Sequence, residues 1–297
     1  MAENANVYLG YDQAGLDRQY NNRARFPNFT EHFQSWRKWS DETKGRIRGV
    51  VDLAFGPTEA EKIDIFPADR AGAPLYVFIH GGYWYSLDKA DYSYVADGMK
   101  PHGIATTVNN FGLAPAYDMD EIVRQNRAAL AFLWRRAAEY GADPGRIYVA
   151  GHSAGGHLAA LLLATDWPSF EPGLPRDLVK GACAIGGIFD LEPIRLSSLN
   201  DKLHLTQNQV TQHSPLRRPA AMAPLLLVVA KDESDEFHRQ SREMARYWKQ
   251  NGGSCELIVP EGLDHFDVVN QLKDPACSLV RLQLDHMRTA FGASRRL

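Results

Sequence analysis

The feature that most constrains this chain is a glycine-rich segment between an apolar run and an alanine- and leucine-rich run. The segment reads Gly151-His152-Ser153-Ala154-Gly155, which is the pattern G-x-S-x-G. The run 147–150 before it predicts a strand, and the run 158–164 after it predicts a helix. A strand that turns directly into a helix brings two backbones close together, so small residues are needed there. Such a turn strains the serine and exposes its hydroxyl at the end of the strand. The alternative is a glycine-rich turn that carries no chemistry.

Composition and charge restrict the class of protein. The chain has 297 residues, of which 44% are hydrophobic and 23% charged, which suits one large α/β domain or two small ones. Its net charge is −3, with basic and acidic residues interspersed, so we expect no nucleic-acid partner and no membrane association. We also expect no signal peptide in residues 1–10 and no membrane span.

Cysteine usage and the absence of metal motifs add two expectations. The three cysteines are odd in number and scattered, at Cys183, Cys255 and Cys277. They fit a reduced, cytoplasmic protein better than a disulfide scaffold. No C-x-x-C or H-E-x-x-H motif is present, so we expect no metal site.

Strand and helix patterns alternate along the chain. The predicted strands are 50–55, 62–66, 75–79, 103–108, 147–150, 180–185, 224–230 and 255–259, and the predicted helices are 90–100, 118–140, 158–164, 235–251 and 277–291. The first two strands form an antiparallel pair, since Gly56-Pro57 separates them. The rest predicts crossover connections, and hence a mostly parallel central sheet with helices on both faces. No linker or repeat interrupts the pattern, so we expect one α/β domain over residues 1–297.

Two segments fall outside this alternation. Residues 1–45 are polar and aromatic, and Phe29, Phe33, Trp36 and Trp39 recur at a loose helical spacing. We expect a helix that packs on the main body, and we expect the segment to roof a pocket. Residues 189–219 form the one long irregular stretch, and their leucines predict a small packed cap over the active site.

A serine nucleophile needs a base, and the base needs an acid that orients it. At strand–turn–helix sites of this kind, these residues follow the order serine, acid, histidine along the chain. Six histidines follow Ser153, and His265 lies alone in a loop just past the last predicted strand. Catalytic groups of open sheets gather at the carboxyl ends of strands. We therefore expect Ser153 as the nucleophile and His265 as the base.

The acid should follow the strand 224–230, where four carboxylates crowd together. Asp235 and Glu236 open the next predicted helix, where acids are favourable because of the helix dipole. Asp232 and Glu233 remain, and position alone leaves both open, since either could accept a hydrogen bond from His265.

Donors for a developing oxyanion are expected in two places. His80-Gly81-Gly82-Tyr83-Trp84 directly follows the buried strand 75–79, and its two glycines allow the backbone to approach a bound carbonyl. The N–H of Ala154, the residue after the nucleophile, is the second source.

Together these motifs resemble the α/β-hydrolase fold, in its hormone-sensitive-lipase-like branch. The resemblance rests on His80-Gly81-Gly82, on Gly151–Gly156 and on Phe111–Pro115, which looks like that branch's Tyr-Arg-Leu-Ala-Pro segment with Phe and Gly as departures. The sequence His-Gly-Gly-Tyr-Trp is similar to that of the kynurenine formamidase group. The segment Glu233–Ser241, which reads E-S-D-E-F-H-R-Q-S, is also similar to a segment of that group.

The resemblance implies a serine hydrolase that cleaves a small aryl formamide, another amide or an ester through an acyl-enzyme, without a cofactor. Aligned with the group, the acid falls on Glu233, and the oxyanion donors fall on Gly82, Tyr83 and Ala154. The residues expected to bind the oxyanion or the substrate are Gly81, Gly82, Tyr83, Trp84 and Ala154.

The expected partner is a small aromatic amide or ester, because Trp84, Tyr85 and the aromatic N-terminal segment favour a flat substrate. A homodimer is compatible with this interpretation. Three alternatives remain: a short-chain carboxylesterase with an unrelated substrate, an enzyme that transfers the acyl group to an acceptor other than water, and a non-catalytic binding protein with the same fold.

Overall fold

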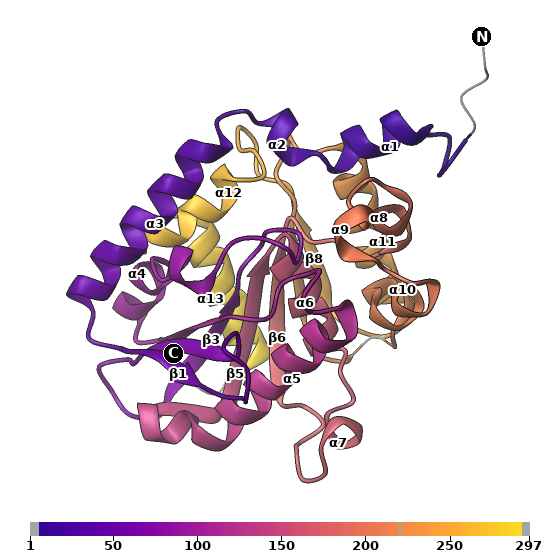
Figure 1. The fold of residues 1–297 in the computed structure, drawn as a ribbon. Coiled ribbons are helices and arrows are strands. Elements are labelled where there is room, and N and C mark those ends of the chain that lie inside the picture. Colours follow the sequence, from indigo (N-terminus) through magenta and orange to yellow (C-terminus); the bar gives the residue numbers. More distant parts are fainter. Residues whose placement is uncertain (1–5, 220, 293–297) are drawn as a thin grey trace.

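A computed structural model describes residues 6–219 and 221–292, in which one eight-stranded sheet forms the centre (Figure 1). The strand order is β1-β2-β4-β3-β5-β6-β7-β8. The β1–β2 and β2–β4 pairs are antiparallel, and all other neighbours are parallel. The strands are β1 (Val50–Ala54), β2 (Lys62–Phe66), β3 (Ala73–Ile79), β4 (Ala105–Asn109), β5 (Ala142–His152), β6 (Val179–Ile185), β7 (Leu225–Val228) and β8 (Cys255–Ile258). This confirms the mostly parallel sheet and the antiparallel first pair that the sequence predicts.

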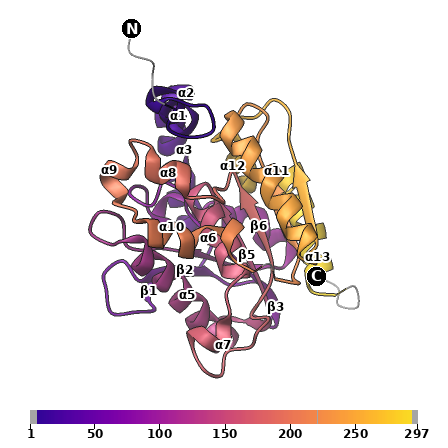
Figure 2. The same ribbon diagram turned by 90° about the vertical axis from the view of Figure 1, so that its right-hand side faces the viewer.

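Helices cover both faces of the sheet (Figures 1 and 2). Side chains of β3 alternate between two hydrophobic clusters, with Val77 in one and Phe78 in the other. The first cluster includes residues of α5, α6 and α11, and the second includes residues of α3, α4 and α13. The longer helices are α1 (Gln13–Tyr20), α3 (Phe29–Arg46), α5 (Met119–Arg136), α6 (Ala154–Leu163), α11 (Asp235–Gln250) and α13 (Ser278–Ala290).

Short helical turns connect these elements. They are α2 (Asn22–Arg25), η1 (Lys89–Asp91), α4 (Val95–Met99), η2 (Lys100–His102), η3 (Ala137–Tyr140), α7 (Trp167–Phe170), α8 (Glu192–Leu196), α9 (Asn200–Leu203), α10 (Gln207–His213), η4 (Pro215–Arg217), α12 (Asp267–Asn270) and η5 (Gln271–Lys273). No helix among the described residues has both the length and the apolar character needed to cross a bilayer.

The predicted continuous helix over residues 90–100 is wrong. Asp88 and Asp91 form a capping box around η1, which confines the first turn to three residues. The chain resumes as α4, where Gly98 packs against the backbone of η5: a Cβ there would lie 2.2 Å from the carbonyl oxygen of Leu272. Local capping at η1 therefore outweighs the helical pattern. The predicted helix 118–140 also divides, into α5 and η3.

The two segments outside the alternation are largely helical. Residues 29–46 form α3, which carries the four aromatic residues predicted to lie on a helix. Residues 189–219 contain α8, α9, α10 and η4, and bury Leu191, Ile194 and Leu203. Residues 1–5 of the predicted N-terminal segment and residues 293–297 of the predicted domain lie outside the described residues.

The first turn of α6 lies against the end of β3. A Cβ added at Gly155 would lie 2.0 Å from the carbonyl oxygen of Ile79, and one at Gly151 would lie 2.1 Å from the carbonyl oxygen of Gly155. Both distances are far below van der Waals contact, so only glycine permits this approach. The small residues that the strand–turn–helix pattern predicts are thus required by backbone packing.

One histidine of α6 is buried in the core. His157 accepts a hydrogen bond at Nδ1 from the Trp84 indole N–H (3.2 Å) and donates from Nε2 to the carbonyl of His213 (2.7 Å). These bonds satisfy both nitrogens of a neutral ring. Burial lowers the pKa of His157 to about 3.

We predict that Gly155→Ala lowers the free energy of unfolding by about 3 kcal/mol or prevents folding, because the new methyl group overlaps the Ile79 carbonyl. The matched control is Gly45→Ala within α3, where an added Cβ has no neighbour within 4 Å. That change should be neutral or stabilise the protein by up to about 1 kcal/mol. Urea unfolding measures both, and equal effects at the two sites would contradict the packing argument.

We also predict a pH effect on stability from His157. Its folded-state pKa of about 3 lies below the unfolded value of about 6.5, so the folded protein binds fewer protons at mildly acidic pH. The stabilisation is complete above the unfolded pKa and is lost as the pH falls, by about 2 kcal/mol between pH 7 and pH 5. The His157→Gln variant should be less stable at pH 7, but should lose about 2 kcal/mol less over this interval in urea titrations. An unchanged pH dependence would argue against a neutral buried ring.

Candidate active site

Ser153 occupies the turn between β5 and α6 with a strained backbone. Its φ is 57° and its ψ is −117°, a conformation that a residue with a Cβ rarely adopts. The residue is 3% exposed. Its hydroxyl therefore lies at the carboxyl edge of the sheet, at the position that the G-x-S-x-G pattern predicts.

His265 lies in the loop between β8 and α12 and is held by a buried carboxylate. Its Nδ1 donates to Glu233 Oε2 over 2.7 Å, and the two side chains are 2% and 0% exposed. The other oxygen of Glu233 accepts the N–H of Ala230 (2.9 Å), which fixes the carboxylate. Because Nδ1 is engaged, Nε2 is the ring nitrogen left to exchange a proton.

The structure distinguishes the two carboxylates that the sequence left open. Glu233 contacts His265, whereas Asp232 is exposed to solvent. Asp235 is also exposed, but Glu236 is buried and accepts a hydrogen bond from Tyr20 (2.9 Å), so it is more than a charge at a helix end.

Ser153 and His265 line one small cavity, which we call the inner cavity. It offers about 30 Å³ to the centres of water-sized molecules, which is room for about two waters. Among the described residues, no hydrogen bond joins the Ser153 hydroxyl to His265. Catalytic hydrogen bonds are often long before substrate binds. The lining residues are Asn22, Arg23, Phe33, Trp36, Gly82, Tyr83, Leu87, Tyr92, His152, Ser153, His265 and Phe266.

Glycine at the end of β6 lets the imidazole approach. A Cβ at Gly186 would lie 3.0 Å from two ring atoms of His265 and 3.2 Å from Glu233. On the other side, His152 donates from Nε2 to the carbonyl oxygen of His265 (2.8 Å), which fixes the backbone of the loop. Burial, together with the nearby His265, lowers the pKa of His152 well below its usual range, so its ring is neutral. Sequence reasoning assigned no role to His152.

The glycine-rich loop after β3 lies beside the serine. A Cβ at Gly81 would lie 3.2 Å from Ser153 Cβ, so the loop backbone passes next to the hydroxyl. Gly82, Tyr83 and Trp84 all have positive φ values, of 106°, 51° and 59°. Gly82 adopts this conformation freely, whereas Tyr83 and Trp84 are strained. The run turns the backbone sharply at the cavity, as is common at functional sites.

The predicted oxyanion residues lie around the serine in different ways. Gly82 and Tyr83 line the inner cavity. Ala154 is the first residue of α6, so its N–H is among those that no carbonyl of the same helix can accept. Gly81 contributes a close backbone approach instead of a lining surface.

The structure places the Trp84 side chain, which the sequence suggested as a substrate contact, away from both cavities near the serine. The indole is fully buried, donates to His157, and lines neither of the cavities near the serine. Its positive φ turns the side chain away from the cavity and into the core. Tyr83, its neighbour, is the aromatic residue of this loop that lines the cavity.

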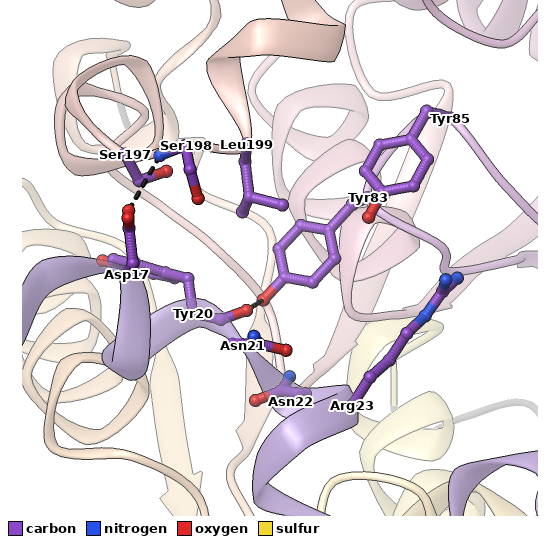
Figure 3. Close-up of a pocket in the computed structure, with 10 residues that line it drawn as sticks. All are labelled: Asp17, Tyr20, Asn21, Asn22, Arg23, Tyr83, Tyr85, Ser197, Ser198 and Leu199. Atoms are coloured by element: carbon purple, nitrogen blue, oxygen red, sulfur yellow. Dashed lines mark hydrogen bonds between the residues drawn. The ribbon is translucent and has the colours of Figure 1, made fainter. Parts of the chain in front are cut away.

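Tyr83 also lines a second, outer cavity of about 160 Å³ (Figure 3). Its hydroxyl donates to the carbonyl oxygen of Tyr20 over 2.6 Å, which ties the loop to the N-terminal segment. Asn22 and Arg23 line both cavities. The outer cavity is lined by Asp17, Tyr20, Asn21, Asn22, Arg23, Tyr83, Tyr85, Ser197, Ser198 and Leu199.

The N-terminal segment thus contributes polar residues that sequence reasoning missed. Phe33 and Trp36, which were expected to pack or to roof a pocket, line the inner cavity. Asn22 and Arg23 lie beside them, but belong to no motif and to no apolar repeat. No local pattern could have singled out these two residues, because only the path of the segment across the sheet edge brings them there.

One group of side chains has a spacing that a metal ion could use. The ligand atoms of His32, Asp264 and Asp267 lie within 4.8 Å of one another. Both ring nitrogens of His32 are already within hydrogen-bond distance of side-chain amides, those of Asn28 (3.1 Å) and Asn270 (3.0 Å). Asp264 accepts two backbone N–H groups. These bonds account for the cluster, and we assign no metal to it.

The chain is similar to known proteins over most of its length. A family model described as BD-FAE matches residues 62–171. A kynurenine formamidase of Danio rerio is 29% identical over 261 residues, which cover 85% of this chain and 87% of the relative. A kynurenine formamidase of Drosophila melanogaster is 26% identical over 254 residues, which cover 81% and 83%.

Two solved structures are similar to this chain in their fold. The crystal structure of a proposed thioesterase from Silicibacter sp. TM1040 has a TM-score of 0.79 at 27% identity, covering 90% of this chain and 97% of the other. A hyperthermophilic esterase from the archaeon Pyrobaculum calidifontis has a TM-score of 0.70 at 18% identity, covering 96% and 98%, and shows the fold alone. The chain therefore has the α/β-hydrolase fold and is similar over most of its length to kynurenine formamidases, and in its fold to esterases.

Proposed function

We propose that this chain is a serine hydrolase that cleaves a small aryl formamide or a related amide or ester, as kynurenine formamidases do. The observation that carries the proposal is the convergence of three distant loops at one sheet edge. Ser153 and His265 line the same cavity, and Glu233 holds the imidazole from behind at 2.7 Å.

The proposed reaction passes through an acyl-enzyme. The Ser153 oxygen attacks the substrate carbonyl while its proton moves to His265 Nε2. The N–H groups of Gly82, Tyr83 and Ala154 stabilise the oxyanion. The C–N or C–O bond then breaks, and the leaving amine or alcohol takes the proton from His265. A water molecule gives a proton to His265 and attacks the acyl group, and the departing serine oxygen recovers that proton.

The size of the inner cavity favours a short acyl group. The space that it offers to the centres of water-sized molecules, about 30 Å³, suits a formyl or acetyl group better than a long chain. Aromatic side chains of Phe33, Trp36 and Tyr83 line the same cavity, which suits a flat leaving group. The formamidase activity of the relatives fits both features.

We further propose that residues 1–45 and 189–219 cover the active site of a single domain formed by residues 1–297. Four residues of the first segment line the inner cavity, and Ser197–Leu199 of the second line the outer cavity. The three cysteines are free thiols, which suits a reducing compartment, so we place the protein in the cytoplasm.

The second candidate is a short-chain carboxylesterase with an unrelated physiological substrate. The similarity to a proposed thioesterase and the small acyl cavity favour this candidate as well. A non-catalytic binding protein is less well supported, because Ser153, Glu233 and His265 are all present and closely placed.

We predict that the purified protein hydrolyses N-formylkynurenine and short nitrophenyl esters, and that Ser153→Ala lowers both rates by at least about 10³-fold. A fluorophosphonate probe should label the wild type and not the variant. Turnover of the esters without the formamide would favour the second candidate. Absence of both turnover and labelling would support the binding protein.

The two neighbouring carboxylates provide a matched pair for testing the proposed acid. Glu233→Gln should lower kcat by about 10³–10⁴-fold, because a neutral amide neither fixes the tautomer of His265 nor stabilises its cation. Asp232→Asn, one residue away and exposed, should keep kcat near that of the wild type. Steady-state kinetics on nitrophenyl acetate decide this, and comparable losses in both variants would reject Glu233 as the specific partner.

A further inference from the structure

Asn22 is a buried polar side chain without a partner. It is the first residue of α2 and is 2% exposed. Neither its Oδ1 nor its Nδ2 has a hydrogen-bond partner among the described residues. Leaving a buried polar group unpaired costs about 1–3 kcal/mol, so such a group calls for a functional explanation.

The local helix does not explain this side chain. Asn21, the residue before it, caps α2 by accepting the N–H of Ala24 at 3.1 Å. Asn22 thus has no capping bond to make. The first turn of α2 instead carries its amide toward the inside of the molecule, whereas Arg23, the next residue, is exposed.

The position of Asn22 connects it with the proposed reaction. It lines the inner cavity together with Ser153 and His265, and it also lines the outer cavity with Tyr83. Figure 3 shows it between Asn21 and Arg23 on the N-terminal segment, at the wall of the outer cavity. A substrate whose acyl group lies at Ser153 and whose leaving group extends outward would pass this amide.

The chemistry of the side chain suggests which substrate it recognises. A primary amide offers one acceptor oxygen and two N–H donors. An N-aryl amide carries an N–H next to the scissile carbonyl, whereas an ester has an oxygen there that can only accept. Asn22 Oδ1 can accept a hydrogen bond from the N–H of the amide, whereas toward an ester only Nδ2 can bond, by donating to the bridging ester oxygen, which is a weak acceptor. Sites that hydrogen-bond a substrate N–H discriminate strongly against analogues that lack it.

We propose that Asn22 is a specificity-determining residue that accepts a hydrogen bond from the N–H of an N-aryl amide bound at Ser153. The inference rests on the proposed function, which it refines from amides and esters to amides. A second unpaired nitrogen, His152 Nδ1, belongs to the same cavity. The Asn22 side chain differs from this nitrogen in two ways: it offers both a donor and an acceptor, and it lines both cavities.

The experiment compares acetanilide with phenyl acetate, which differ only in N–H against oxygen. Both are bound to full-length Ser153→Ala protein, in which the ester is not consumed through the serine, and the dissociation constants are measured by titration. We expect acetanilide to bind about tenfold more tightly than phenyl acetate. Adding Asn22→Leu should bring the ratio of the two dissociation constants, phenyl acetate over acetanilide, close to one.

Asn28→Leu is the matched control, because this exposed asparagine lies on the same segment and lines neither cavity. It should leave the ratio of dissociation constants as it is in the Ser153→Ala protein. If Asn22→Leu leaves the ratio unchanged, if Asn28→Leu lowers it equally, or if acetanilide does not bind, the proposal is overturned. Since binding needs no turnover, a selective effect of Asn22 on binding, combined with a wild-type protein that hydrolyses neither formamides nor esters, would reject the proposed function alone.

Discussion

The close backbone contact between β3 and the start of α6 is the constraint on which the site depends. Gly155 lies so near the Ile79 carbonyl that no Cβ fits between them. This contact brings the end of β3 next to the turn that holds Ser153, so the loop that follows β3 necessarily passes beside the hydroxyl. The nucleophile and the proposed oxyanion donors are thus positioned by one packing contact between backbones, and not by flexible side chains.

The base is held by a separate set of contacts on the other side of the serine. His265 is fixed at Nδ1 by Glu233 and at its carbonyl by His152, while Gly186 leaves space for the ring. Because His152 immediately precedes Ser153, the same turn that strains the serine also supports the histidine loop. Each loop is therefore oriented by contacts with the others, which explains how three segments far apart in the sequence meet in one small cavity.

The N-terminal segment completes the site from outside the sheet. The backbone carbonyl of Tyr20 accepts a hydrogen bond from the Tyr83 hydroxyl. The side-chain hydroxyl of Tyr20 donates to Glu236 and accepts a hydrogen bond from Gln240 (2.7 Å). These bonds connect the loop after β3 with the first turns of α11, the helix that follows Glu233. The segment is thereby held across the site, and it places Asn22 at the boundary between the two cavities.

The sequence by itself determined the features that depend on neighbouring residues. Alternating apolar runs predicted the sheet, and the glycines around Ser153 predicted the strained turn, because side-chain period and the strand–turn–helix pattern are carried by residues close together in the chain. Position along the chain left Asp232 and Glu233 open and the resemblance favoured Glu233, but only the tertiary structure placed Glu233 against His265. The tertiary structure also turned Trp84 into the core, divided the predicted helix 90–100, and brought Asn22 to the cavity. These outcomes depend on which distant loop or side chain each residue meets, and that information is spread over the whole fold.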